Sequence, residues 1–192
     1  MNVQDAECSD GCTVADARAM DANGLALCRL QGRIFRESAQ VAACSSAVFV
    51  RRFMRSSVAA ALDAQDNGIF AQTASQLVKQ VQSEYENESY GTQKYPLETL
   101  YWMGYFYRYW AYAFDMESVK VYRMIGAREL CGLYLPYHAM DIPQAIERIC
   151  EAKGLPLCRR ASVEEGVRAL RQIRARRAEA GTSSYEYYVL DW

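Results

Sequence analysis

The chain has 192 residues, of which 51% are hydrophobic and 12% aromatic, and its 22 Lys and Arg residues offset 23 Asp and Glu residues. A chain of this length is expected to form one domain, with enough apolar side chains to fill a core. Its charged content of 23% excludes a wholly disordered protein. The net charge of −1 excludes a general polyanion-binding protein, although it leaves room for local basic patches.

The start of the chain does not have the pattern of a secretory signal. Residues 1–16 carry four acidic side chains and no Lys or Arg, whereas a signal begins with basic residues and continues with an apolar run. The most apolar stretch, residues 100–114, contains Arg108 and five tyrosines, which makes it a poor membrane helix. We therefore expect a cytoplasmic protein with no membrane partner and a flexible acidic lead-in over residues 1–13.

The seven cysteines do not form a recognisable metal or disulfide pattern. An odd number cannot pair completely, and Cys8 and Cys12 lie four residues apart with no histidine nearby, unlike the repeated pairs of a zinc site. Cysteines that fall among apolar residues are expected to act as small core side chains. These are Cys28, Cys44, Cys131 and Cys150. We expect reduced thiols, no bound metal and no cofactor.

Apolar residues recur at helical spacing in the first half of the chain, from Val14 onward. Ser45 and Ser46 are placed to cap the second of these helices, and the polar run 63–68 is placed to stop it. The predicted helical segments of this half are residues 14–35, 45–62 and 69–86.

The second half follows a polar connection over residues 87–96. Pro96 suits the first turn of a helix, where its missing N–H has no partner to lose, so a helix is expected from there to Phe114. Asp141 and Gln144 have the spacing of a capping box, and Gly154 suits the end of that helix. Further helices are predicted at residues 117–125, 127–137, 141–154 and 162–180.

These segments predict an all-α protein, a single-domain bundle of about seven or eight helices over residues 14–181 with a central aromatic-rich helix. Residues 182–192 form a Tyr-rich tail whose composition favours a short extended conformation. Because a single strand needs a partner, we expect this tail to dock on the body of the protein or on another chain.

The aromatic helix is the unusual feature of the sequence, because nine of the fourteen residues 101–114 are aromatic. One buried stripe does not need so many rings. The helix therefore either lies at the centre of the bundle or exposes rings to a partner. Tyr, Trp and Arg dominate the energetics of protein interfaces, so four of its residues are candidate partner contacts: Tyr105, Arg108, Tyr109 and Tyr112.

Two basic clusters favour recognition of carboxylates or phosphates. Arg51 and Arg52 belong to the first, together with Arg55, and seven arginines at residues 159–177 form the second. The alternative is an ordinary solvated helix face. Residues 118–131 also have the pattern of a helix-turn-helix with a glycine at the turn, although Arg128 is its one base-reading side chain.

His138 is the only histidine, so any acid–base or nucleophilic mechanism that needs one must use it. No phosphate-binding, dinucleotide-binding or nucleophile-elbow motif accompanies it, and the carboxylates show no diagnostic pairing. We interpret His138 as a capping or structural residue. With its neighbour Tyr137, it is retained as a candidate partner contact, and no catalytic residue is predicted.

Several stretches resemble a family of small bacterial proteins that are encoded beside ADP-ribosyltransferase-like toxins, in what look like toxin–antitoxin modules. These stretches are residues 45–56, 100–110, 134–138 and 141–149. The resemblance spans residues 33–154. It implies an antitoxin or accessory subunit that neutralises a partner toxin, and it implies no catalytic residues.

The first hypothesis is therefore a non-enzymatic, antitoxin-like subunit that occludes a partner protein through the exposed rings of the aromatic helix, or through the tail 185–192. The second is a nucleic-acid-binding regulator that uses Arg51, Arg52, Arg55 or the last helix. A third, which the sequence supports least, is an enzyme that uses His138 with a nearby carboxylate or cysteine.

Overall fold

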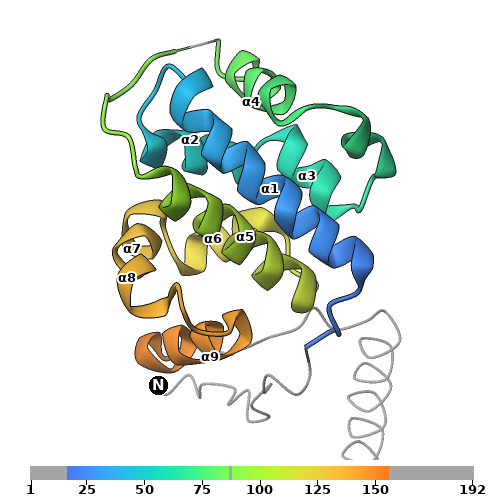
Figure 1. The fold of residues 1–192 in the computed structure, drawn as a ribbon, viewed down its shortest axis with the longest axis vertical. Helices are drawn as coiled ribbons and strands as arrows, with labels where there is room; N and C mark the ends of the chain where they lie inside the picture. Colours follow the sequence, from blue (N-terminus) through green and yellow to red (C-terminus); the bar gives the residue numbers. More distant parts are fainter. Residues whose placement is uncertain (1–16, 87, 156–192) are drawn as a thin grey trace, which may run out of the picture. The chain divides into compact units, whose positions relative to one another are not determined.

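The computed structural model describes residues 17–86 and 88–155, all of which lie in one compact unit. This part of the chain is entirely helical, with nine α-helices and one 3-10 helix (Figure 1), which confirms the all-α prediction. Several predictions fall outside the described residues: the acidic lead-in 1–13, the Cys8 and Cys12 pair, the Arg-rich helix 162–180 and the tail 182–192.

The first half of the described chain forms four α-helices, with a short 3-10 helix between the third and the fourth. In chain order these are α1 (Ala22–Val41), α2 (Ser46–Phe53), α3 (Ser57–Asp63), the 3-10 helix η2 (Asn67–Ala71) and α4 (Ala74–Ser83). The second half contains the aromatic helix and four shorter ones: α5 (Leu97–Ala113), α6 (Ser118–Met124), α7 (Ala127–Gly132), α8 (Tyr134–Tyr137) and α9 (Ile142–Lys153).

Helix α5 is the central helix of the bundle, as predicted. Twelve of its 17 residues are buried, and it contacts α1, α6, α7, α8 and α9, with α1 alongside it over much of its length (Figure 1). The two backbones meet at Gly104, where an added Cβ would lie 2.5 Å from the carbonyl oxygen of Gln31. Glycine is needed here because no side chain fits between the helices.

The start of α1 is tied to the end of α5 by Asp21. One oxygen of this N-cap accepts the Gly24 amide at 2.7 Å and the Tyr112 hydroxyl at 2.8 Å. These bonds to the charged form lower the pKa of Asp21, with the Gly24 amide contributing most. Asp21 therefore caps the N-terminus of α1 and fixes the register of α1 against α5.

Two predicted helices are each broken in the structure. The segment 45–62 divides into α2 and α3, because the Ser56 hydroxyl accepts the Ala59 amide at 3.2 Å and starts a new helix. The segment 69–86 divides at Thr73, which forms a reciprocal capping box with Gln76. In both cases a Ser or Thr cap interrupts a continuous apolar stripe, and the stripe alone did not reveal it.

The predicted segment 127–137 is also divided, at Leu133, into α7 and α8. Helix α9 begins after Asp141 as expected, but the Asp141 side chain makes no capping hydrogen bond, so the predicted capping box is wrong. Gly154 ends α9 with φ +60°, as predicted for a left-handed helix terminus.

The connection from α4 to α5 runs along α2 and is held by backbone and side-chain contacts. The Ser45 amide donates to the Tyr90 carbonyl at 3.0 Å, and the Lys94 ammonium donates to the carbonyls of Ala42 and Cys44 at 2.6 and 2.7 Å. Burial lowers the pKa of Lys94. This fixed path places Tyr90 beside α2.

The core is built from interlocking aromatic rings. Phe35 meets Phe53 edge-to-face at a centroid distance of 5.0 Å, and it also contacts Phe49 and Tyr107. The four described cysteines are free thiols. Cys28, Cys44 and Cys150 are buried, as predicted, whereas Cys131 is only partly buried. No helix in the described part of the chain is both long and apolar enough to span a membrane.

Candidate functional site

Arg108 lies inside the bundle, where its guanidinium is fully engaged. It is 1% exposed and donates to Gln31 at 2.8 Å, Asp63 at 2.6 Å and Ser118 at 2.7 Å. Asp63 also accepts the backbone amide and hydroxyl of Ser118 at 2.8 and 2.7 Å. The network joins α1, α3, α5 and α6, so Arg108 is a structural residue and the expectation that it is exposed to a partner is wrong.

Tyr112 and Arg52 are also buried, at 5% and 7% exposure, contrary to their proposed role as surface contacts. Tyr112 donates to Asp21. The Arg52 guanidinium donates to the Glu88 carbonyl at 2.7 Å and lies 5.1 Å from the ring centre of Tyr85. Both side chains therefore hold segments of the bundle together.

The outer side of α5 carries three tyrosines at intervals of four residues. Tyr101, Tyr105 and Tyr109 are partly exposed, and the rings of Tyr105 and Tyr109 stack with centroids 6.5 Å apart and planes inclined by 27°. Burial raises the pKa values of Tyr105 and Tyr109, so both phenols are neutral at physiological pH. Two of the four predicted contacts on this helix thus lie at the surface.

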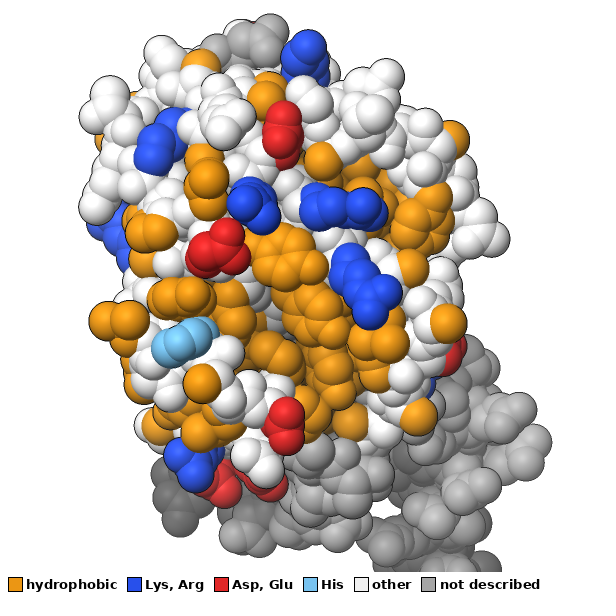
Figure 2. Space-filling view, in the orientation of Figure 1, with side chains coloured by type: hydrophobic (Ala, Val, Ile, Leu, Met, Phe, Trp, Pro, Cys, Tyr) orange, Lys and Arg blue, Asp and Glu red, His pale blue; other side chains and the backbone are white. Residues whose placement is uncertain are grey.

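A row of arginines on α1 runs beside these tyrosines. Arg29, Arg33 and Arg36 are exposed and, together with Tyr101 and Phe70, line a shallow hollow of about 640 Å³. Figure 2 shows hydrophobic side chains gathered over α5 and Lys or Arg side chains along the adjoining α1. We call this surface the tyrosine face: Tyr101, Tyr105, Tyr109, Arg29, Arg33 and Arg36.

The charges of the tyrosine face are largely uncompensated. Arg36 makes a 3.5 Å ion pair with Glu98, but both side chains are more than half exposed, so the pair is weak. Arg29 and Arg33 make no ion pair with any residue of the described ranges. The face therefore combines neutral rings with excess positive charge.

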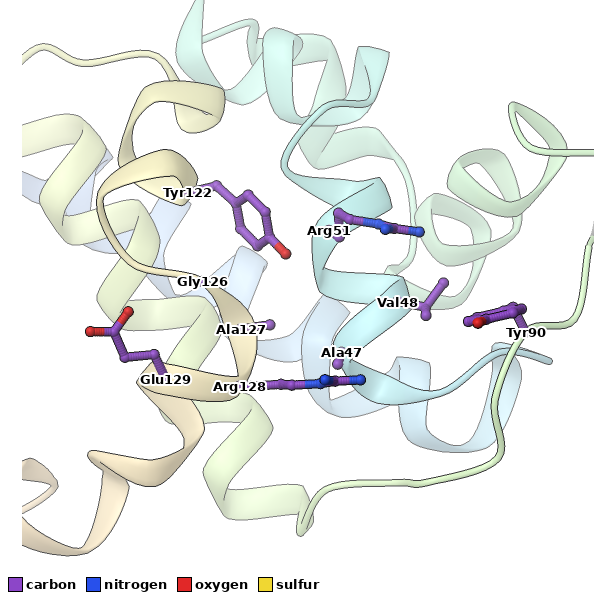
Figure 3. A pocket seen from close by; sticks show the side chains of 9 residues that line it. All are labelled: Ala47, Val48, Arg51, Tyr90, Tyr122, Gly126, Ala127, Arg128 and Glu129. Atoms are coloured by element: carbon purple, nitrogen blue, oxygen red, sulfur yellow. The ribbon is translucent and has the colours of Figure 1, made fainter.

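A second hollow, of about 510 Å³, lies between α2 and the α6–α7 turn. Arg51 and Arg128 extend along it from α2 and α7, with Ala47 and Val48 between them (Figure 3). Tyr90 and Tyr122 also line it. We call it the arginine hollow. It brings together Arg51 of the first basic cluster and Arg128 of the predicted helix-turn-helix, whereas Arg52 points into the protein.

His138 and Tyr137 lie at the end of α8. His138 is exposed, and its ring stacks on Tyr134 at a centroid distance of 4.8 Å. Its Nδ1 lies 3.1 Å from the Tyr134 carbonyl and 3.0 Å from the Leu135 carbonyl, so the tautomer with the hydrogen on Nδ1 donates to carbonyls of its own helix. This is the geometry expected of a structural histidine.

Sequence reasoning missed the three arginines of the tyrosine face. Arg29, Arg33 and Arg36 follow the i, i+4, i+7 spacing of one helix side, and this signal was available in the sequence. The adjacent arginines Arg51 and Arg52 give a more conspicuous sequence signal, but they lie on different sides of a helix.

Within residues 17–86 and 88–155, no group of three or more His, Cys, Asp or Glu side chains is placed to hold a metal ion. Comparisons of the chain with protein-family models, with curated proteins and with solved structures find no match.

Proposed function

We propose that this chain is a non-catalytic, antitoxin-like subunit that neutralises a partner protein by binding it on the tyrosine face. The observation that carries the proposal is the alignment of three partly exposed tyrosines on α5 with three exposed arginines on α1. The sequence resemblance to proteins encoded beside ADP-ribosyltransferase-like toxins supports a toxin as the partner.

The residue types of the tyrosine face are those that contribute most to protein–protein binding. Tyr and Arg are enriched among residues whose truncation weakens complexes, and a tyrosine offers a large contact area with few torsions to freeze. Stacking already restrains Tyr105 and Tyr109. The rings therefore lose little conformational freedom when a partner covers them.

The charge of the face defines the chemistry of its partner. Arg29 and Arg33 are exposed and make no ion pair within the described residues. The surface is therefore positively charged even though Arg36 pairs with Glu98. A partner with carboxylates around an apolar patch would match both features. The opposite charges would accelerate encounter and fix the orientation of the complex.

The scaffold beneath the face is rigid, because Gly104 and Gln31 hold α1 and α5 in direct backbone contact and the Arg108 network links four helices. Binding groups on packed helices keep their relative positions, so the face is formed before the partner arrives.

The test is co-expression with the toxin-like product of the adjacent gene, scored by growth and by the dissociation constant of the purified complex. The wild-type chain should restore growth and co-purify with its partner. Replacing Tyr105 and Tyr109 together by alanine should raise the dissociation constant about 30-fold or more. The exposed pair Arg29→Gln and Arg33→Gln should raise it about tenfold and make it less sensitive to salt.

The matched control is Arg51→Gln with Arg128→Gln, which removes the same two charges from the arginine hollow and should leave the complex unchanged. Melting curves of each variant check that the fold is retained. The proposal fails if the wild-type chain neither binds nor rescues. The assignment of the face fails if the arginine-hollow variant loses binding while the tyrosine-face variants keep it.

A further inference from the structure

We propose that the arginine hollow binds a nucleotide, with the phosphate held between Arg51 and Arg128 and the base against a tyrosine ring. The hollow is separate from the tyrosine face: its lining comes from α2, the α4–α5 connection, α6 and α7. The inference concerns a small-molecule or single-strand ligand and does not depend on the toxin-binding proposal.

The electrostatics of the hollow favour an anion. Arg51 and Arg128 are exposed and make no ion pair with any residue of the ranges 17–86 and 88–155. Glu129 is the one carboxylate of its lining, but both of its oxygens lie 2.8 Å from the Lys153 ammonium. Figure 3 shows Glu129 and Arg128 pointing in opposite directions from α7. The two guanidiniums thus face the hollow without a neutralising acid.

Two guanidiniums are well suited to a phosphate group. Each presents several N–H donors in a fixed plane and can make paired bonds to phosphate oxygens, which a lysine ammonium does not. In Figure 3 the side chains of Arg51 and Arg128 extend in the same direction on either side of Ala47 and Val48. A phosphate in the hollow could therefore contact both arginines.

The rings of the hollow supply a surface for a planar base. The Tyr122 ring is held in place by two neighbours. It packs against Tyr107 at a centroid distance of 6.3 Å, and the Arg55 guanidinium lies 5.6 Å from its centre. Tyr90 is 70% exposed and lies at the far side of the hollow (Figure 3). Base–tyrosine stacking stabilises nucleotide complexes without selecting one sequence.

The size of the hollow also fits. At about 510 Å³, it falls within the range of about 300–1,000 Å³ that is usual for small-ligand sites. Ala47 and Val48 give it an apolar floor, on which a base can lie. The same chemistry would accept a free mononucleotide or one unit of a single-stranded nucleic acid.

The experiment is calorimetric titration of the purified full chain with AMP, GMP, CMP and UMP, with adenosine and inorganic phosphate as partial ligands. A single-stranded oligonucleotide of mixed sequence tests the polymer source. At least one mononucleotide, or the oligonucleotide, should bind. Adenosine and phosphate alone should each bind at least about tenfold more weakly, because each lacks one of the two contacts.

The variants Arg51→Gln and Arg128→Gln should each raise the dissociation constant about tenfold, and Tyr90→Ser should raise it by about fivefold or more through lost stacking. Arg33→Gln, which removes the same charge from the tyrosine face, is the matched control and should bind as the wild type does. All four positions are exposed, so the fold should be retained.

Tight binding of a mononucleotide would identify a free nucleotide as the ligand. Binding of the oligonucleotide alone, with a steep salt dependence that the two arginine variants reduce, would identify single-stranded nucleic acid. The inference is overturned if none of the four mononucleotides and no oligonucleotide binds, or if binding is the same in the wild type and in the Arg51 and Arg128 variants.

Discussion

The inner and outer sides of α5 both carry tyrosines, but the surroundings of these tyrosines differ. On the inner side, Arg108 is 1% exposed and donates to three side chains, and Tyr107 donates to the Ile125 carbonyl at 2.9 Å. On the outer side, Tyr105 and Tyr109 are partly exposed and stack on each other. Residue type alone therefore does not separate a buried structural side chain from one that is available to a partner, whereas burial and hydrogen bonding do.

Helix α2 repeats this contrast in two adjacent residues. Arg52 is 7% exposed and holds the Glu88 carbonyl, whereas Arg51 is exposed and lines the arginine hollow. Adjacent positions on a helix point about 100° apart, so one arginine enters the protein and the other leaves it. An arginine whose donors are already used cannot offer them to a ligand without weakening the fold.

The largest expected change in stability comes from removing the charge of Arg108 on the inner side of α5. Arg108→Met should lower the free energy of unfolding by about 3 kcal/mol, because Asp63 and Gln31 lose their partner in a buried network. Urea denaturation measures this change. Arg33→Met, at an exposed position of α1, should stay within about 0.5 kcal/mol of the wild type. Equal stabilities of the two variants would contradict the structural role of Arg108.

The second largest expected change in stability comes from disturbing the backbone contact between α1 and α5. Gly104→Ala should lower the free energy of unfolding by about 2 kcal/mol, because the added Cβ would meet backbone atoms of Gln31 and Gly32 at 2.5–2.9 Å. Gly132→Ala is the control, since an added Cβ there has nothing within 4 Å. That variant should match the wild type or gain up to about 1 kcal/mol from helix propensity. Thermal and urea unfolding of both variants decide the comparison.

Replacing Arg52 of α2 should change the stability by a smaller amount, and its neighbour Arg51 provides the matched control. Arg52→Gln should destabilise the protein by about 1.5 kcal/mol, because the Glu88 carbonyl loses a charged donor at 2.7 Å. Arg51→Gln should leave stability within about 0.5 kcal/mol of the wild type. If Arg51→Gln proves the more destabilising of the two, the assignment of Arg52 as structural and Arg51 as available for binding is reversed.

The sequence predicted the helical class and a central aromatic helix, but the density of rings in residues 101–114 was equally consistent with rings exposed to a partner. It did not predict the breaks at Ser56 and Thr73, where a short polar side chain ends a stripe that remains apolar on both sides. It also did not reveal which arginine was buried. Two of the three partners of Arg108, Gln31 and Asp63, lie 77 and 45 residues away in the chain, and local spacing carries no information about contacts at that distance.

The smallest expected change in stability concerns Tyr107, on the inner side of α5, and depends on pH. Burial raises the pKa of Tyr107 well above its usual value, with the nearby Tyr122 acting in the same direction. Because the folded protein favours the protonated phenol, Tyr107 contributes stability that is fully present below about pH 10 and is lost as the pH rises above it. Tyr107→Phe should cost about 1 kcal/mol at neutral pH, through the lost bond to Ile125.

The same substitution should reduce the alkaline loss of stability, because phenylalanine has no proton to release. The stability difference between wild type and Tyr107→Phe should therefore shrink as the pH rises above about 10. Urea unfolding at a series of pH values measures it, with Tyr90→Phe as the control at a ring that is 70% exposed. The control should follow the wild-type profile. A constant difference between wild type and Tyr107→Phe over the alkaline range would show that the Tyr107 hydroxyl does not keep its proton inside the bundle, and that the two sides of α5 differ less than their burial indicates.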